Sequence, residues 1–391
     1  MGEYMKYNEN FFKLKNDYVF TDLAQKVASK KSQGGESIID LGIGDVKLPI
    51  FDLATKAMQK ACEELSIKST FRGYPPSQGY KFLRDKISAE YFEAGAQITP
   101  DEIFITDGAK GQLGGVLELF GSGAKTLFLS PCYPAGAESN ILYGNSVSYL
   151  CGSVENGFIP SPPFGKFYDL IYICSPNNPT GSAMTFSDLA LWIDYALSTD
   201  AVIIYDSAYS AYLTDEFPKS VYCLPKANRC AIEINSFSKS LGFTGVRCGY
   251  TVVPTALGDY NKLWKRRLAC RFNGVSYPVQ RGAEAVFCEQ GRLEIKKRIN
   301  FYKTNAEILK IALKNLNLWY NNSVCSPYVF ASTPKGVSSA EFCSKLLMEK
   351  SVVATPGVGF GDGGEGYFRL SAFGDRQEIL TASDRLKTLK F

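Results

Sequence analysis

Histidine is absent from this chain of 391 residues. Without an imidazole the protein has no Ser-His-Asp or Cys-His nucleophilic site, no histidine-liganded zinc or iron, and no imidazole acid–base pair. Any proton transfer in an active site must therefore use lysine, tyrosine, aspartate, glutamate or cysteine.

The net charge is small, and long apolar runs are absent. The 43 basic and 39 acidic residues leave a net charge of only +4, which does not indicate a nucleic-acid-binding surface. No apolar run approaches the roughly 20 residues of a membrane-spanning helix. The N-terminus is polar and lacks the apolar core of a signal peptide. We therefore expect neither nucleic acid nor membrane as a partner.

Cysteine spacing excludes further classes of protein. The eleven cysteines are an odd number and are scattered singly, without a Cys-x-x-Cys pair. This spacing argues against a disulfide framework and against a zinc ribbon. Some of them, such as Cys174, lie inside apolar runs, where a free thiol behaves as a small hydrophobic group. The sequence therefore predicts a cytoplasmic protein with reduced thiols and no metal site.

Short apolar runs alternate with helical patterns between about residues 100 and 255. Runs of four to six residues occur at 103–106, 126–129, 170–174, 202–205, 231–235 and 248–253, and helices are expected at 112–120 and 187–197. Continuous apolar runs with helices between them are typical of mostly parallel strands that are buried on both faces. The pattern predicts an α/β domain.

The pattern changes after residue 280. A charged helix is expected at 281–315, strands at 328–331 and 367–370, and a Gly-rich loop at 357–366. We predict a large domain at 46–280 and a small α+β domain at 281–391. The N-terminal arm, 1–45, is expected to join the small domain. No Pro- or Ser-rich linker separates the domains, so the cleft between them is the expected binding site.

The strongest local motif runs from Asn235 to Arg247. Lys239 follows an apolar strand, and Ser236 and Ser238 share one face by the period-2 rule. Lysine can form an imine with an aldehyde, and a desolvated lysine is activated for this reaction. Two hydroxyls and a guanidinium also suit a phosphate. A solvated lysine in a Ser/Gly turn explains the same residues equally well.

An acidic residue ends the next informative strand. Asp206 follows the apolar run 202–205, and Tyr209 comes three residues later. A buried carboxylate needs a partner, and the protonated nitrogen of a pyridine ring would supply one. An aspartate at a strand-to-helix turn often caps the helix instead, and for this motif alone capping is the simpler interpretation.

Two further turns follow strands. In the turn 175–181, two prolines restrict the backbone and can aim the amide of Asn178 inward, although a tight turn is the alternative. In the turn 106–111, the backbone N–H groups of Ala109 and Lys110 would begin a helix and bind a phosphate at its positive end. Many α/β turns look like this one, and it lacks the Gly-Lys-Ser/Thr of a nucleoside-triphosphate loop.

Two more side chains are candidates for the ligand site. Arg369 stands among apolar residues in a strand-like segment, where an unpaired guanidinium would be costly. A substrate carboxylate bound in a bidentate manner would resolve that cost, and so would an internal Asp or Glu. Tyr133 could stack on an aromatic ring or belong to the core.

Together these motifs resemble those of the class I/II aminotransferases, which are pyridoxal-phosphate enzymes of fold type I. Their order along the chain is Gly-Ile-Gly, Asp-Gly-Ala-Lys, Tyr-Pro, Pro-Asn-Asn-Pro-Thr-Gly, Asp-x-x-Tyr, Ser-x-Ser-Lys and a late Arg. The segments 41–46, 73–80, 237–250, 272–277 and 366–373 are most similar to the LL-diaminopimelate aminotransferase branch. The resemblance implies a large domain with a mostly parallel central sheet flanked by helices, a small α+β domain, and pyridoxal 5'-phosphate as cofactor.

The resemblance also implies a role for each residue. Lys239 would be joined to the cofactor aldehyde, Asp206 would pair with the ring nitrogen, and Arg369 would bind the substrate α-carboxylate. Asn178 and Tyr209 would contact the ring hydroxyl, and Tyr133 would stack on the ring. The implied phosphate contacts are Ala109, Lys110, Ser236, Ser238 and Arg247, with Tyr74 of the partner subunit. The implied substrate contacts are Tyr18, Gly44, Lys110, Tyr133 and Asn178, with Asn273 of the partner subunit.

The resemblance implies that the enzyme moves an amino group from LL-diaminopimelate to 2-oxoglutarate, which gives tetrahydrodipicolinate and glutamate, and that it also catalyses the reverse reaction. The reaction would follow a ping-pong mechanism in a homodimer whose active sites are shared across the interface. The chain departs from the usual family pattern at 106–110 and at 134–139, which leaves recognition of the far end of the substrate open.

Three alternatives differ in activity or in class. The same cofactor site could serve a broader glutamate, aspartate or aromatic aminotransferase, or a lyase that eliminates from its substrate. A ligand-sensing transcription regulator would need a DNA-binding module, and the residues before the fold show no helix-turn-helix pattern or basic patch.

Overall fold

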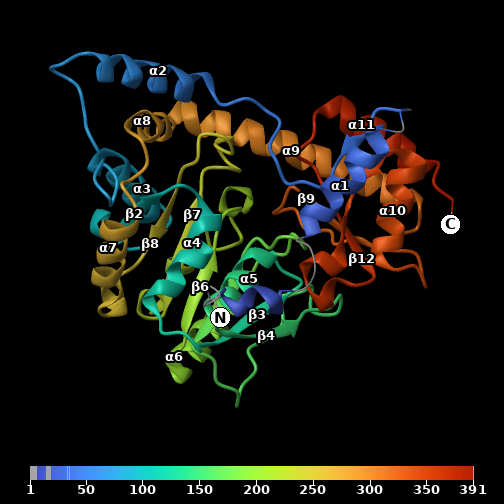
Figure 1. Cartoon of the computed structure of the whole chain (residues 1–391), viewed down its shortest axis with the longest axis horizontal. Coiled ribbons are helices and arrows are strands. Elements are labelled where there is room, and N and C mark those ends of the chain that lie inside the picture. The colour runs from blue at the N-terminus through green and yellow to red at the C-terminus, as the bar shows by residue number, and fades with distance from the viewer. Residues whose placement is uncertain (1–6, 15–18, 33, 35, 391) are drawn as a thin grey trace, which may run out of the picture.

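The computed structural model describes residues 7–14, 19–32, 34 and 36–390. Within them, a seven-stranded sheet in the order β2-β8-β7-β6-β5-β3-β4 forms the centre of the larger part (Figure 1). Neighbouring strands from β7 to β4 are parallel, and β8 is antiparallel to both β7 and β2. The strands are β2 (Ile103–Thr106), β3 (Lys125–Ser130), β4 (Ser146–Cys151), β5 (Leu170–Cys174), β6 (Val202–Asp206), β7 (Ala231–Ser236) and β8 (Gly249–Val252).

Burial on both faces explains why these strands were predictable. Along β6, Ile203 packs into the hydrophobic cluster on one face of the sheet and Ile204 into the cluster on the other. The expected mostly parallel α/β sheet is confirmed. Of the seven strands in this sheet, β4 alone was not predicted, because this edge strand is largely exposed and carries no continuous apolar run.

Helices cover both faces of the sheet. Side chains of α3, α6 and α8 pack into the first cluster, and those of α4, α5 and α7 into the second. The helices of the described residues are α1 (Val19–Ser32), α2 (Asp52–Ser66), α3 (Lys81–Glu93), α4 (Ala109–Gly115), α5 (Pro134–Tyr143), α6 (Phe186–Thr199), α7 (Tyr260–Arg271), α8 (Tyr277–Ala285), α9 (Glu289–Asn315), α10 (Ser339–Lys350) and α11 (Arg376–Lys387).

Two helix predictions need correction. The helix expected at 112–120 begins earlier, as α4, and continues as the 3₁₀ helix Val116–Leu119. The single helix expected at 281–315 is two helices, α8 and α9, and a Cβ on Gly291 would lie 2.1 Å from the carbonyl oxygen of Val286. Glycine therefore permits a close backbone approach at this junction, which the charge pattern does not reveal.

The Gly-rich stretch 357–366 also differs from the plain loop that was expected. It contains two short 3₁₀ helices, Gly357–Phe360 and Asp362–Gly364. A Cβ on Gly357 would lie 2.0 Å from the carbonyl oxygen of Gly364, so glycine at this position allows the turn to close on itself.

A second core lies around the C-terminal strands. An antiparallel sheet has the order β11-β12-β9, and β1 pairs in parallel with β10. Ile39 and Leu41 pack in one hydrophobic cluster with Leu309, Phe342 and Leu370, so the N-terminal segment contributes to this core. Helix α9, orange in Figure 1, links the two parts of the molecule. The strands are β1 (Ile39–Asp40), β9 (Tyr328–Ser332), β10 (Val352–Val353), β11 (Thr355–Pro356) and β12 (Tyr367–Ser371).

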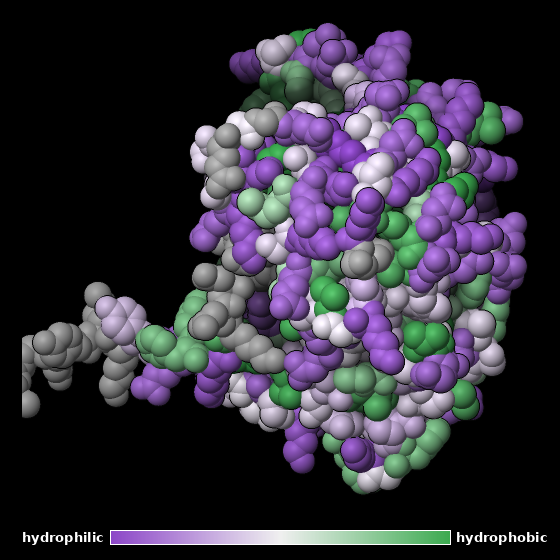
Figure 2. All heavy atoms as spheres, turned by 90° about the vertical axis from the view of Figure 1, so that its right-hand side faces the viewer, coloured by the Kyte–Doolittle hydropathy of each residue, from purple (hydrophilic) through white to green (hydrophobic). Residues whose placement is uncertain are grey.

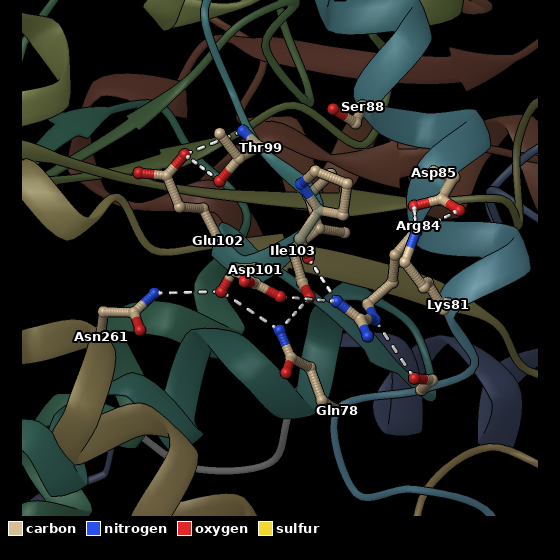
Figure 3. A network of polar contacts seen from close by, with 12 residues as sticks. Gln78, Lys81, Arg84, Asp85, Ser88, Thr99, Asp101, Glu102, Ile103 and Asn261 are labelled. Carbon is tan, nitrogen blue, oxygen red and sulfur yellow. Dashed lines mark hydrogen bonds and ion pairs between the residues drawn. The ribbon is translucent and has the colours of Figure 1, made fainter.

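A polar network anchors the loop before α3 to the edge of the large sheet (Figure 3). The Glu102 carboxylate accepts hydrogen bonds from Thr99 N at 2.9 Å and from Thr255 N at 2.8 Å. Arg84 Nη1 donates to the Pro100 carbonyl at 2.6 Å, and Gln78 Nε2 donates to the carbonyl of residue 101 at 3.1 Å. The Gln78 bond joins the loop that carries Tyr74 to this network.

The outer face formed by α1, α10 and α11 is mostly hydrophilic, with small separate apolar patches (Figure 2). In the part of the chain that the structure describes, the longer helices carry too many charges, and too little apolar length, to cross a membrane.

Candidate active site

A cavity of about 390 Å³ lies where the carboxyl ends of β6 and β7 meet β9 and β12. Its lining joins segments that are far apart in the sequence. Among the residues proposed from the sequence, it includes Gly44, Ala109, Lys110, Tyr133, Asn178, Asp206, Tyr209, Ser236, Ser238, Lys239, Arg247 and Arg369. The structure thus brings together twelve of the fifteen predicted site residues. Ligands of α/β proteins commonly bind at this end of the sheet.

Asp206 is a half-buried carboxylate at the end of β6. It lies opposite Cys174 in the register of β5 and β6, and its Oδ1 accepts a hydrogen bond from Ala208 N at 3.0 Å. Burial raises the pKa of Asp206 to about 6, although the Ala208 N–H opposes this shift. The next helical turn, Ser210–Tyr212, has Tyr209 as its N-cap, so Asp206 does not cap a helix. A carboxylate at this depth, beside a cavity, also suits a cationic group of a ligand.

Lys239 follows β7 and points into the same cavity. Its Nζ donates a hydrogen bond to the Gly44 carbonyl and lies 5.3 Å from the centroid of the Phe373 ring. Burial lowers the pKa of Lys239 to about 8; Asp45 opposes the shift, and Arg369 adds to it. A solvated lysine in a turn is therefore the wrong interpretation.

A group of anion-binding donors lies beside Lys239. Ser236 Oγ donates to Ser238 Oγ at 3.0 Å, and Arg247 Nη1 donates to Ser238 Oγ at 3.2 Å. Gly108 is the N-cap of α4 and has φ +109°, and a Cβ there would lie 2.6 Å from Arg247 Nη2. Hydroxyls, a guanidinium and the first N–H groups of a helix together suit a phosphate.

Arg369 is almost completely buried, with 1% of its surface exposed. Its Nη1 donates to Asn178 Oδ1 at 2.7 Å, and its Nη2 donates to the Gly42 carbonyl and, at 3.3 Å, to Thr355 Oγ1. Its guanidinium carbon also lies 4.4 Å from the centroid of the Tyr328 ring. These neutral acceptors orient the guanidinium, and a guanidinium can bind a carboxylate through two parallel hydrogen bonds.

A pair of tyrosines forms another wall of the cavity. The hydroxyls of Tyr209 and Tyr328 are 2.7 Å apart, and burial raises the pKa of Tyr209, which keeps its hydroxyl protonated. A Cβ on Gly44 would lie 2.0 Å from Tyr328 Oη, so only glycine fits at this position. Sequence analysis missed Tyr328, because it begins an ordinary apolar strand. It also missed Asp45 and Thr244, which lie inside quoted motifs but were given no role of their own.

Three predicted residues are not in this cavity. The side chain of Tyr74 is 87% exposed, and Asn273 is exposed as well. Their two loops touch, since a Cβ on Gly274 would lie 2.8 Å from the Pro76 carbonyl oxygen. Tyr18 lies outside the described residues.

Comparison with known proteins identifies the class. The model of the family described as aminotransferase class I and II matches residues 36–386. The chain therefore belongs to the class I and II aminotransferase family and is an enzyme of that type, as the motif order predicted. A solved aspartate aminotransferase from Thermus thermophilus, 21% identical over 98% of this chain and 99% of that chain, has a TM-score of 0.88, which confirms the fold.

Within the family, several relatives that match nearly the whole chain share one name. The LL-diaminopimelate aminotransferases of Parabacteroides distasonis and Bacteroides thetaiotaomicron are each 45% identical to this chain, over 97% of it and 98% of their own length. A solved L,L-diaminopimelate aminotransferase from Chlamydomonas reinhardtii is 35% identical, covers 99% of both chains and has a TM-score of 0.93. The expected resemblance to this branch is confirmed.

Proposed function

We propose that this enzyme is a pyridoxal-phosphate-dependent LL-diaminopimelate aminotransferase. It moves an amino group from LL-2,6-diaminopimelate to 2-oxoglutarate, which gives tetrahydrodipicolinate and glutamate, and it also catalyses the reverse reaction. The observation that carries the proposal is one cavity lined by Lys239, Asp206 and Arg369, which come from three separate segments. The 45% identity to relatives of that name supports the substrate.

The cavity fits pyridoxal 5'-phosphate by its donor set. Asp206 offers a carboxylate to the ring nitrogen, Lys239 offers an amine to the aldehyde, and Ser238 with Arg247 offers donors to the phosphate. Any side chain larger than glycine at position 108 would meet Arg247, so this part of the cavity is shaped as a cradle. When bound, the cofactor supplies an electron sink that stabilises negative charge on the substrate Cα.

The chain's own residues position the substrate and move the proton. Arg369, held by Asn178, binds the α-carboxylate and so fixes the direction of the Cα–H bond. Lys239 Nζ, whose pKa burial lowers to about 8, would accept the Cα proton and deliver it to the cofactor carbon that carried the aldehyde. The hydroxyl of Tyr209 stays protonated and shares its hydrogen bond with Tyr328 at the wall of the cavity. Because the amino group leaves one substrate before the second binds, ping-pong kinetics follow.

The pKa of Lys239 predicts how the apoprotein takes up its cofactor. Only the unprotonated amine attacks an aldehyde, and the pKa of Lys239 is lowered to about 8. The rate of reconstitution with pyridoxal phosphate should therefore rise about tenfold per pH unit below pH 8 and level off above it. Stopped-flow absorbance between about pH 6.5 and pH 10 measures this rate. A rate that still climbs toward 10.5, the ordinary pKa of lysine, would contradict the prediction.

A substrate panel tests the proposed reaction. The purified holoenzyme should form glutamate from LL-diaminopimelate and 2-oxoglutarate, and should use aspartate and aromatic amino acids much more slowly. Failure to form glutamate from LL-diaminopimelate, with good activity on other amino acids, would replace the proposal by the broader aminotransferase. Product release without an oxo acid would identify a lyase.

We also propose a cytoplasmic homodimer. Tyr74 and Asn273 lie exposed on touching loops, where they can reach the cavity of the partner subunit. All eleven cysteines are free thiols, which suits a reducing compartment. Light scattering should give twice the chain mass of 43.1 kDa, and a monomer of full activity would overturn the shared site.

A further inference from the structure

A hydrogen bond between two tyrosine hydroxyls joins the two parts of the molecule at the cavity. Tyr209 follows β6 of the large sheet, and Tyr328 is the first residue of β9 in the C-terminal sheet. Their Oη atoms are 2.7 Å apart, and both side chains line the cavity. Both are buried, with 7% and 3% of their surfaces exposed. The family resemblance implies a role for Tyr209 at the ring hydroxyl of the cofactor and none for Tyr328.

Packing holds the Tyr328 side chain in place on several sides. A Cβ on Gly44 would lie 2.0 Å from Tyr328 Oη, so this hydroxyl lies directly against the backbone of residue 44. The guanidinium carbon of Arg369 lies 4.4 Å from the centroid of the Tyr328 ring. The ring of Phe373 meets the same ring edge to face, with 5.9 Å between centroids. These contacts fix the Tyr328 hydroxyl next to that of Tyr209.

The protons of this pair determine which tyrosine donates. Burial raises the pKa of Tyr209 and that of Tyr328, so both hydroxyls are protonated and each has one proton to donate. When Tyr209 donates its proton to an acceptor in the cavity, the bond between the tyrosines persists only if Tyr328 donates to Tyr209. A hydroxyl that accepts a hydrogen bond becomes a stronger donor, because linked hydrogen bonds polarise one another.

We propose, resting on the pyridoxal-phosphate part of the proposed function, that Tyr328 is a positioning residue for Tyr209. Its hydroxyl donates to Tyr209 Oη, which aligns and strengthens the hydrogen bond from Tyr209 to the ring hydroxyl oxygen of the cofactor. That oxygen carries negative charge beside the nitrogen that links Lys239 to the cofactor. A stronger donor stabilises this charge and favours loss of the proton from that nitrogen. Tyr328 therefore lowers the pKa of the Lys239–cofactor linkage by acting through Tyr209.

A pH titration of the holoenzyme measures the pKa of this linkage without turnover, because its visible absorbance changes when the nitrogen loses its proton. The variants are Tyr328→Phe, which removes the hydroxyl and keeps the ring, Tyr209→Phe, and the double variant. Tyr212→Phe is the matched control. Tyr212 is fully buried in the same aromatic cluster as Tyr328, and among the described residues its hydroxyl has no hydrogen-bond partner.

We expect Tyr209→Phe to raise the pKa of the linkage by roughly 1–2 units and Tyr328→Phe to raise it by roughly 0.5–1 unit. In the Tyr209→Phe background, the further substitution Tyr328→Phe should add less than about 0.2 unit, because its effect passes through Tyr209. Tyr212→Phe should also shift the pKa by less than about 0.2 unit. Fully additive shifts of Tyr209→Phe and Tyr328→Phe would overturn the proposal, since Tyr328 would then act independently of Tyr209. Absence of a shift in Tyr328→Phe would overturn it as well.

Substrate binding separates this role from one that acts through Arg369, which lies over the Tyr328 ring. Tyr328→Phe keeps that ring, so in the half-reaction with glutamate the concentration at half-maximal rate should change by less than about twofold. A large rise in this concentration, with an unchanged pKa of the linkage, would contradict the proposal and assign Tyr328 to substrate binding. Failure of the proposed function has a different signature: the wild-type protein mixed with pyridoxal phosphate would then show no visible band that shifts with pH.

Discussion

Replacing Lys239 by alanine should lower kcat/KM for transamination by roughly 10⁴-fold or more. The substitution removes both the amine that holds the cofactor aldehyde and the base that moves the Cα proton, and proton transfer alone contributes about 10²- to 10⁴-fold. A glutamate-formation assay with saturating pyridoxal phosphate measures the loss. Lys262→Ala is the matched control, because that lysine is 82% exposed on α7 and should leave the activity unchanged.

The same variant gives a readout that does not depend on turnover. Borohydride reduction of the wild-type holoenzyme should attach the cofactor permanently to the peptide that contains Lys239, and mass spectrometry locates the added mass. In Lys239→Ala this labelled peptide should disappear. Labelling of another lysine in the wild type, or activity in the variant above about 1% of wild type, would overturn the assigned role.

Asp206→Asn has the second largest expected effect. A neutral amide cannot pair with a protonated ring nitrogen, and loss of one partner of a buried ion pair costs about 3–5 kcal/mol. We therefore expect the rate of the half-reaction with LL-diaminopimelate to fall by about 10²- to 10³-fold, as measured by stopped-flow absorbance. The asparagine is nearly isosteric, so Lys239 should still react with the cofactor aldehyde.

The stability of the apoprotein provides the control for this variant. The pKa of Asp206 is raised to about 6, so the folded state binds its proton more tightly than the unfolded chain does. In wild-type apoprotein this group therefore contributes stability at acidic pH, which is lost as the pH rises through about 6. Asp206→Asn should lack this loss and unfold no earlier than wild type at pH 8. A half-reaction rate within tenfold of wild type would remove Asp206 from the mechanism.

The parts of the fold that were predictable share a physical cause. Strands β5, β6 and β7 are buried on both faces. Burial on both faces requires a continuous apolar run, and such a run is visible in the sequence. Edge strand β4 needs apolar residues on one face only, and it was missed. The break between α8 and α9 was missed because it depends on a close backbone approach at Gly291 rather than on composition.

The sequence by itself determined which chemical groups are available: no imidazole, one lysine after a buried strand, an acid after another, and an arginine in a late apolar strand. Motif order was enough to indicate the family. The tertiary structure alone decided that Arg369 is held by Asn178 and that Tyr328 lies against Gly44 at the cavity. Such contacts join residues far apart in the chain, and they depend on how helices and sheets pack, which local patterns do not encode.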